Sequence, residues 1–439
     1  MATLKAVRGT RDLLPPETEL WNRVEATARR VFARYHFGEI RTPIFEDTGL
    51  FARGVGEETD IVSKEMYTWE DRARAQSEKS QSLTLRPENT AGVVRAYIEH
   101  KLGETGQLQK LYYIGPQFRR ERPQKGRYRQ FWQIGAEVIG PPSAGSESPL
   151  RDAEILEMLA TLLDELGIEG WTLELNSVGS TADRERYNEV LRNALAEVAP
   201  KMCADCQRRA VTNPLRVLDC KAHEDQPIIE ALPRIGDALD QASKDHFAAV
   251  TAALDATGVP YKLNSRLVRG LDYYTRTTFE FTHGGLGAQN ALLGGGRYDG
   301  LSEAIGGPKA PGIGFAIGLD RLVLTLQGQP KIALDTICVE TPCHAYIAPL
   351  GEGQNAAALA LARELRKSDL RIEIGDGSFR LKKSFEIANK LAWRIVILGE
   401  DEAKSGILTV KDFLSGVQAK VPRAELSAYL QKPADGVST

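Results

Sequence analysis

One stretch constrains the fold of this chain more than any other. Residues 112–139 read YYIGPQFRRERPQKGRYRQFWQIGAEVI, in which two runs of aromatic and β-branched residues flank a loop with Pro123 and Gly126. Such runs around a loop of this kind predict two antiparallel strands joined by a turn. Because strand side chains alternate between faces, the mostly apolar row from Trp132 to Val138 is expected to be buried. The opposite face is then expected to line a cleft.

The cations of this predicted hairpin indicate what the cleft binds. The loop and its shoulders contain Arg119, Arg120, Arg122, Lys125, Arg127 and Arg129. Arginine presents a planar fork of donors that suits phosphate, and Phe131 on the cleft face can stack on a base. A solvated charged hairpin is the plainer alternative. We favour a nucleotide-phosphate site, because a carboxylate (Glu121), an amide (Gln133) and an aromatic ring share the same strand pair.

Length and composition bound the remaining organisation. A chain of 439 residues is expected to form two or three domains. Its net charge is −3, so a nucleic-acid partner would have to use local basic patches. No apolar run approaches the roughly 20 residues of a membrane span, and the first residues lack the apolar core of a signal peptide. Five unevenly placed cysteines fit a reducing, cytoplasmic compartment better than a disulfide framework.

Changes in pattern predict where the domains lie. Residues 183–255 are mostly helical and separate two segments with strand signals, so we interpret them as an inserted helical domain within a main domain of residues 1–327. After a linker at residues 328–335, strand and helix patterns alternate. This alternation predicts a small α/β domain over residues 336–439 with a largely parallel sheet. The last domain has no GxxxxGK[ST] or GxGxxG motif, so nucleotide hydrolysis there is not expected.

Glu88 is a candidate site residue because of its position. It lies between a predicted strand and a helix that Asn89 or Thr90 would cap. By itself, a carboxylate at a helix start needs no ligand, since it interacts favourably with the helix dipole.

Two further segments carry candidates. Three consecutive glycines, Gly294–Gly296, would let the backbone approach another group closely, although such a run is often only a turn. Arg321 lies near the start of a predicted helix, where a positive charge is unfavourable without an anion nearby. Arg321 is therefore a second anion-binding candidate, unless it pairs with Asp320 or another carboxylate.

A cysteine-rich segment in the predicted insert contains a candidate metal site. The text CADCQRRAVTNPLRVLDCKAH places Cys203 and Cys206 in a CxxC pair, and Cys220 with His223 completes a CxxC…CxxH pattern. Four soft ligands at this spacing suit tetrahedral zinc. The alternative is four reduced side chains without a metal. If zinc is bound, catalysis would not use it.

The ordered motifs resemble those of bacterial-type histidyl-tRNA synthetases, a family of class II aminoacyl-tRNA synthetases. The segment around Pro43 resembles class II motif 1, residues 118–140 resemble motif 2 with its loop, and residues 312–322 resemble motif 3. Residues 267–280 (LVRGLDYYTRTTFE) and 294–301 (GGGRYDGL) are similar to segments peculiar to the histidine enzymes. The resemblance covers nearly the whole chain.

This resemblance implies a fold and an activity. The fold would be α+β, an antiparallel sheet flanked by helices with a helical insertion and a C-terminal α/β anticodon-binding domain. Motif 1 would form a homodimer interface. The enzyme would be a histidine–tRNA ligase, which activates histidine with ATP and Mg²⁺ to histidyl-adenylate plus pyrophosphate. It would then transfer histidine to the 3′ end of its tRNA.

The resemblance also implies roles for individual residues. ATP would be held by Arg119, Glu121, Arg127, Phe131 and Arg321. Histidine would be held by Glu88, Thr90, Gln133, Glu137, Arg269, Tyr273 and Tyr274, with Glu137 and Tyr274 gripping the imidazole. Arg119 and Arg269 would be catalytic at the α-phosphate, where many class II enzymes use a metal in place of Arg269. Gln124 and Arg129 would approach the acceptor end of the tRNA.

Two other functions fit parts of the same pattern. A synthetase-like paralogue serves as a regulatory subunit in histidine biosynthesis, but we expect such a protein to lose the phosphate-binding arginines and the anticodon-binding domain. A class II synthetase for another amino acid is disfavoured by the LVRGLDYY segment. One departure from the family pattern is Asn89, where glycine is common beside the pocket carboxylate.

Overall fold

The computed structural model describes residues 3–56, 59–71, 80–124, 126–286, 290–329 and 342–432. The chain divides into two compact units, Met1–Cys338 and Val339–Thr439. Lys125 of the arginine-rich loop, most of the linker expected at residues 328–335 and both ends of the domain expected at residues 336–439 lie outside the described residues.

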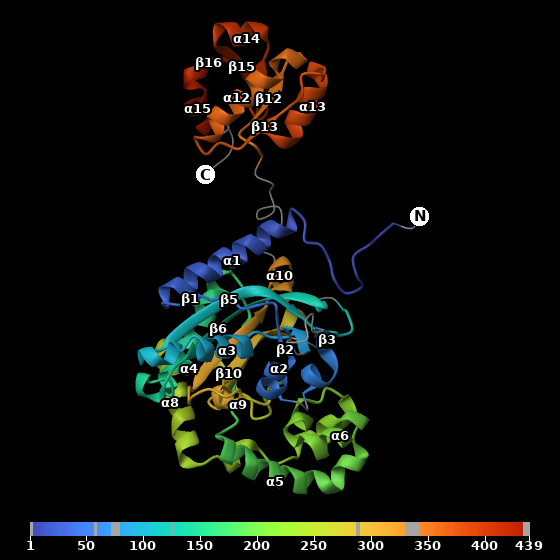
Figure 1. Cartoon of the computed structure of the whole chain (residues 1–439), viewed down its shortest axis with the longest axis vertical. Coiled ribbons are helices and arrows are strands. Elements are labelled where there is room, and N and C mark those ends of the chain that lie inside the picture. Colours follow the sequence, from blue (N-terminus) through green and yellow to red (C-terminus); the bar gives the residue numbers. More distant parts are fainter. Residues whose placement is uncertain are drawn as a thin grey trace. The chain divides into compact units, whose positions relative to one another are not determined.

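An eight-stranded sheet forms the centre of the first unit (Figure 1). Its strands lie in the order β1 (Gly38–Glu39), β5 (Gln109–Phe118), β6 (Gln130–Ile139), β11 (Gly312–Gly318), β10 (Ala291–Arg297), β9 (Thr275–His283), β7 (Trp171–Ser177) and β8 (Tyr261–Leu263). Within this order, each neighbouring pair in the run β5, β6, β11, β10, β9 and β7 is antiparallel. At the two edges, β1 pairs parallel with β5, and β8 pairs parallel with β7. The antiparallel sheet expected from the sequence is thereby confirmed.

Helices cover the apolar face of this sheet. Ile134, Ala136 and Val138 of β6 are buried in one cluster with side chains of α1 (Glu17–Arg34) and α4 (Pro149–Glu165). Helices α8 (Gln241–Thr257) and α10 (Leu319–Gln327) contribute to the same cluster. Burial of these apolar side chains supplies the main drive for folding. The opposite face of β6, which carries Phe131 and Gln133, is left to line the site.

A smaller sheet in the same unit places the start of a second site helix. Its three strands lie in the order β2 (Phe45–Asp47), β4 (Gln81–Leu85) and β3 (Tyr67–Asp71). Helix α2 (Thr48–Val55) follows β2, and α3 (Thr90–Glu99) follows β4. The short helix α9 (Leu301–Ala304) packs against α3. Glu88 therefore lies in the turn between β4 and α3.

The helices after β7 have a core of their own. Helices α5 (Thr181–Val198), α6 (Ala204–Thr212) and α7 (Gln226–Glu230) contribute to a cluster that is separate from the one beneath the main sheet. Figure 1 shows α5 and α6 (green) on the far side of the sheet from α1. Helix α8 differs, because its Val250 and Leu254 belong to the main cluster and it packs against α4.

The second unit is a five-stranded sheet with helices. The strands lie in the order β13 (Ile372–Ile374), β12 (Ala345–Pro349), β14 (Arg394–Leu398), β15 (Ile407–Asp412) and β16 (Gln418–Pro422). Its helices are α12 (Asn355–Arg366), α13 (Leu381–Leu391), α14 (Glu400–Ser405) and α15 (Arg423–Gln431). The α/β alternation is confirmed, but only β13, β12 and β14 are parallel. Strands β15 and β16 pair antiparallel as a hairpin, so the sheet is mixed rather than largely parallel.

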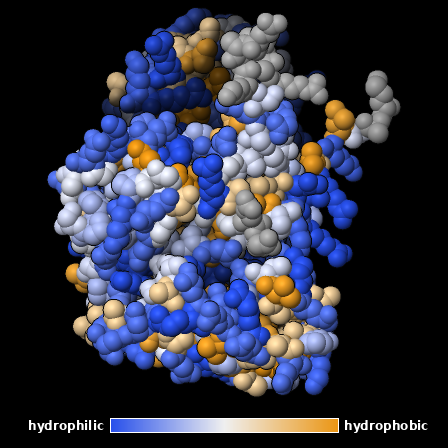
Figure 2. Space-filling view, turned by 60° about the horizontal axis from the view of Figure 1, so that its bottom comes forward, coloured by the Kyte–Doolittle hydropathy of each residue, from blue (hydrophilic) through white to orange (hydrophobic). Residues whose placement is uncertain are grey.

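The face of the molecule drawn in Figure 2 is mainly polar. Figure 2 shows a face on which hydrophilic residues predominate and hydrophobic residues are scattered. Among the helices in the described ranges, none is long and apolar enough to cross a membrane. A few large apolar side chains are nevertheless exposed next to one another around β2 and β3, including Phe45 and Trp69.

Candidate active site

A cavity of about 290 Å³ opens on the polar face of the main sheet. Its lining brings together most residues that the sequence singled out, namely Glu88, Thr90, Arg119, Glu121, Arg127, Phe131, Gln133, Arg269, Tyr273, Tyr274 and Arg321. They come from the loop between β5 and β6, the face of β6, the turn before α3 and the first residue of that helix, the segment before β9 and the start of α10. Segments remote in sequence therefore meet in one concave site, as is usual for ligand-binding pockets.

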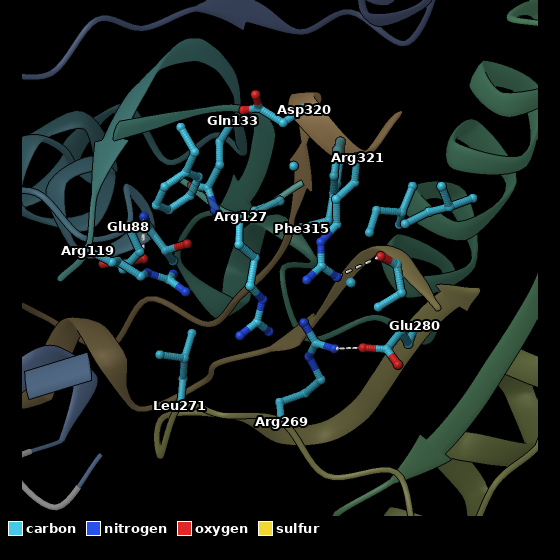
Figure 3. Close-up of a pocket in the computed structure, with 18 of the residues that line it drawn as sticks. Glu88, Arg119, Arg127, Gln133, Arg269, Leu271, Glu280, Phe315, Asp320 and Arg321 are labelled. Atoms are coloured by element: carbon cyan, nitrogen blue, oxygen red, sulfur yellow. Dashed lines mark hydrogen bonds and ion pairs between the residues drawn. The ribbon is translucent and has the colours of Figure 1, made fainter. Parts of the chain in front are cut away.

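Four arginines dominate the cavity. In Figure 3 the guanidinium groups of Arg127, Arg269 and Arg321 point toward one another, with Arg119 nearby. The Arg119 guanidinium also lies over the Phe131 ring, 5.3 Å from its centroid. Burial lowers the pKa of Arg321, and the positive charge of Arg127 lowers it further. Such a gathering of like charges becomes favourable when an anion such as a polyphosphate lies between them.

Carboxylates and carbonyls hold these arginines in place. Arg127 forms an ion pair of 2.9 Å with Glu121, and Arg119 lies 3.8 Å from the same carboxylate. Arg269 pairs with Glu280 of β9. No pattern in the sequence singled out Glu280, although this residue ends the LVRGLDYYTRTTFE segment. Arg119 also donates through Nε to the carbonyl of Pro87 at 2.9 Å.

The start of α3 is capped by Glu88 rather than by the residues predicted for this role. The Glu88 carboxylate accepts hydrogen bonds from the backbone N–H groups of Thr90 (2.8 Å) and Ala91 (3.0 Å). Asn89 occupies the N-cap position, but its side chain accepts from the Thr42 hydroxyl instead. Burial raises the pKa of Glu88, and the two N–H groups act in the opposite direction. Glu88 is thus both a helix cap and a lining residue.

Glu137 lies behind the cavity and is not part of its lining. It is completely buried, and its two oxygens are hydrogen-bonded to the hydroxyls of Thr90 (2.8 Å) and Tyr298 (2.7 Å). Gly314 on the neighbouring strand makes room for this carboxylate, because a Cβ there would lie 1.6 Å from Glu137 Oε2. Burial raises the pKa of Glu137 to about 8.

The two residues expected to face tRNA lie outside the cavity lining. Gln124 and Arg127 exchange backbone hydrogen bonds that close the loop after β5. The backbone N–H of Arg129 donates to the carbonyl of Gly9 at 2.7 Å, and its guanidinium donates to the carbonyl of Arg8 at 3.2 Å. The segment near the N-terminus therefore braces this loop, which no pattern in the sequence indicated.

The glycines at positions 294–296 leave space for side chains of the protein itself. A Cβ on Gly294 would lie 2.5 Å from the Arg269 guanidinium, and one on Gly296 would lie 2.8 Å from the Tyr274 ring. Glycine at these positions of β10 therefore leaves the space in which Arg269 and Tyr274 line the cavity. The following Arg297 is buried and pairs with Asp152 at 2.5 Å, outside the cavity lining.

The cysteines of the predicted metal site come together, but with a different fourth partner. Cys203, Cys206 and Cys220 are grouped with Asp225, and their potential ligand atoms all lie within 4.8 Å of one another. His223 is exposed and is not part of this group.

Comparison with known proteins identifies the family. The family model for histidyl-tRNA synthetase matches residues 9–322, and the model for the anticodon binding domain matches residues 344–433. The chain belongs to the histidyl-tRNA synthetase family. The resemblance inferred from the ordered motifs is thereby confirmed, together with the expected class of C-terminal domain.

Individual relatives agree with this assignment over almost their full length. The chain is 71% identical over 429 residues to the histidine–tRNA ligase of Koribacter versatilis, an alignment that covers 98% of this chain and 96% of that protein. It is 55% identical over 430 residues to the histidine–tRNA ligase of Solibacter usitatus, covering 97% and 99%. The crystal structure of apo histidyl-tRNA synthetase from S. aureus matches with a TM-score of 0.79 at 37% identity, covering 98% of this chain and all of that one.

Proposed function

We propose that this chain is a histidine–tRNA ligase and that the cavity on the main sheet activates histidine with ATP and then transfers it to tRNA. The observation that carries the proposal is the meeting of four arginines with the buried carboxylate of Glu88 in one cavity. Guanidinium groups bind the phosphates of a nucleotide through paired hydrogen bonds, and a buried carboxylate can bind the ammonium group of an amino acid.

On the nucleotide side, Arg119 and Arg269 would hold the α-phosphate and Arg127 and Arg321 the outer phosphates. Adenylation requires a carboxylate oxygen in line with the α-phosphorus, and charge builds up on the leaving pyrophosphate. Fixed guanidinium groups stabilise that charge without reorganising, and loss of one such donor typically costs about 3 kcal/mol in the transition state. Phe131, beneath Arg119, would stack on adenine. Mg²⁺ would enter with ATP as part of the substrate.

On the amino-acid side, Glu88 and Gln133 would hold the ammonium group, and Tyr273 and Tyr274 would enclose the side chain. Glu137 would act on the imidazole through Thr90, because the Thr90 hydroxyl lines the cavity and is hydrogen-bonded to Glu137. A polar pocket of this kind rejects other amino acids, because a wrong side chain would leave the buried polar groups of the pocket without hydrogen-bond partners.

A homodimer and a cytoplasmic location complete the proposal. Ile44 and Phe45, next to the motif 1 proline, and Trp69 of β3 are 40% exposed or more, although each is a large apolar side chain. Exposed apolar side chains gathered in this way support an interface with a second copy of the chain. The tRNA acceptor end would approach along the loop with Gln124 and Arg129, and the anticodon would bind the second unit.

The test is pyrophosphate exchange into ATP with each of the twenty amino acids, before any tRNA is added. We expect exchange with histidine alone. Arg269→Ala should abolish exchange without unfolding the protein, whereas Arg34→Ala should leave exchange unchanged, because Arg34 pairs with Glu165 on the outer surface. Normal exchange in Arg269→Ala would contradict the roles proposed here. Exchange absent with every amino acid would favour the regulatory paralogue instead.

A further inference from the structure

The insert contains a buried group of four side chains that the proposed reaction does not use. Cys206 and Asp225 are completely buried, Cys220 is nearly so, and Cys203 is partly exposed. Cys203 lies directly before α6 and Cys206 in its first turn, while Cys220 and Asp225 flank a short turn that follows the helix. The start of α6 and the turn after it therefore bring four potential ligands together.

Two of the distances between ligand atoms match those of a zinc tetrahedron. Zinc binds thiolate sulfur at about 2.3 Å and carboxylate oxygen at about 2.0–2.2 Å, so tetrahedral geometry requires roughly 3.8 Å between two sulfurs and roughly 3.5 Å between sulfur and oxygen. Cys203 Sγ and Cys220 Sγ are 3.8 Å apart, and Cys220 Sγ lies 3.3 Å from Asp225 Oδ2. The remaining pairs of ligand atoms lie within 4.8 Å of one another, so the four side chains would close in slightly to surround a metal ion.

Charge points to the same conclusion. The groups around the Asp225 carboxylate are the thiols of Cys203, Cys206 and Cys220 and the backbone N–H of Cys203. In the part of the chain that the structure describes, no lysine, arginine or histidine pairs with this carboxylate. These hydrogen bonds stabilise the buried carboxylate, and a divalent metal would add the positive charge that no side chain supplies.

The surroundings of the group resemble the outer shell of a metal site. The Ala222 N–H lies 3.4 Å from Cys220 Sγ and donates to it, and the Cys203 N–H donates to Asp225 at 3.0 Å. The Gln226 side chain donates to the carbonyls of Cys220 (2.8 Å) and Ala222 (3.0 Å), which fixes the turn between the last two ligands. Such contacts orient ligands and tune them in known metal sites.

We propose that Cys203, Cys206, Cys220 and Asp225 hold one structural Zn²⁺ ion in the insert. Three thiolates and one carboxylate form a closed four-ligand set, so the ion would have no open position for a substrate. Soft thiolate ligands select zinc over magnesium or calcium.

The ion would act on the active site by fixing the segment between its ligands. From this segment, Arg216 donates to the backbone carbonyl of Arg269 at 3.3 Å, and Asn213 donates to the Asp272 carboxylate at 2.9 Å. Both acceptors belong to the segment that carries the cavity arginine. Zinc would therefore hold the insert in the form that supports the backbone of Arg269.

The test measures zinc directly in full-length protein purified without chelator and without a histidine tag. We expect about one zinc per chain by elemental analysis, because the ligand set is closed around a single ion. His223→Ala should keep this content, whereas Cys206→Ser should lose it. Asp225→Asn should release zinc to a chelating dye at least tenfold faster than the wild type. Asp225→Cys should retain zinc as a four-cysteine site, and it also checks that the fold tolerates a change at this position.

Substitution with Co²⁺ provides an independent readout. We expect visible absorption bands of tetrahedral cobalt with thiolate ligands in the wild type and in His223→Ala. Wild-type protein that is folded and contains no zinc would overturn the proposal, and so would a disulfide between Cys203 and Cys220 in freshly purified protein. Loss of zinc in His223→Ala with retention in Asp225→Asn would show that the ligand set is wrong. None of these outcomes depends on aminoacylation, so failure here leaves the proposed function intact.

Discussion

Replacement of Glu137 by glutamine tests the electrostatics behind the cavity. The carboxyl group is completely buried, and burial raises its pKa from an ordinary value of 4.5 to about 8. Glutamine has nearly the same shape, and its amide can bond to the hydroxyls of Thr90 and Tyr298, which both donate and accept. Glu137→Gln therefore removes the titration with little change in packing.

The magnitude follows from the linkage between proton binding and folding. Between pH 4.5 and 8, the folded wild type retains a proton on Glu137 that the unfolded chain has released. The stability contributed by this group is fully present below pH 4.5 and falls as the pH rises through the folded pKa. The slope is about 1.4 kcal/mol per pH unit, so the wild type should lose roughly 3–4 kcal/mol between pH 5 and 8 relative to Glu137→Gln.

The assay compares thermal unfolding of the two proteins across this pH range. In a large domain, 1 kcal/mol corresponds to roughly 2 °C, so the melting temperature of Glu137→Gln minus that of the wild type should increase by roughly 6–8 °C from pH 5 to 8. Other groups titrate equally in both proteins and cancel in the difference. Glu104→Gln, at an exposed site, should track the wild type at every pH. A difference for Glu137→Gln that does not change with pH would refute the reasoning.

Other variants test separate parts of the site. Gly294→Ala should reduce histidine-dependent exchange about 100-fold, since the new Cβ displaces the Arg269 guanidinium, while the melting temperature stays nearly unchanged because a flexible side chain can yield. Asp152→Asn should destabilise the protein by about 3–5 kcal/mol in thermal unfolding, because it removes the carboxylate that pairs with the buried Arg297. Phe45→Asp should convert the proposed dimer to a monomer in sedimentation velocity, because it places a charge in the exposed apolar patch.

Features with a regular period were predictable from the sequence. The alternation in β6 correctly assigned Phe131 and Gln133 to one face and the buried apolar row to the other, since a strand has a period of two residues. Such a pattern is local, because burial of one face of the strand determines which residues are apolar, whatever the fold of the rest of the chain.

Features that depend on exact side-chain reach were not predictable in the same way. Asn89 has the residue type of a helix cap, but the preceding Glu88 is long enough to reach the same N–H groups and takes that role. His223 has the spacing of a zinc ligand, yet a 3₁₀ turn begins at this residue and leaves it exposed, while Asp225 at the end of that turn points inward. Residues two apart in so tight a turn face different sides, and spacing alone does not say which one is buried.

The contacts of Arg269 connect these observations to the chemistry. Its charge is paired with Glu280 on β9, its space is provided by Gly294 on β10, and its backbone carbonyl is bonded by Arg216 from the insert. Each of these partners lies in a different element, so Arg269 is positioned only when the sheet and the insert are folded together. Preorganised positioning of this kind is what the phosphate-binding role proposed for Arg269 would require. The segment between Cys203 and Asp225 contributes no residue to the cavity lining, yet through Arg216 it contacts the backbone of a lining residue and would act on the proposed reaction by that route.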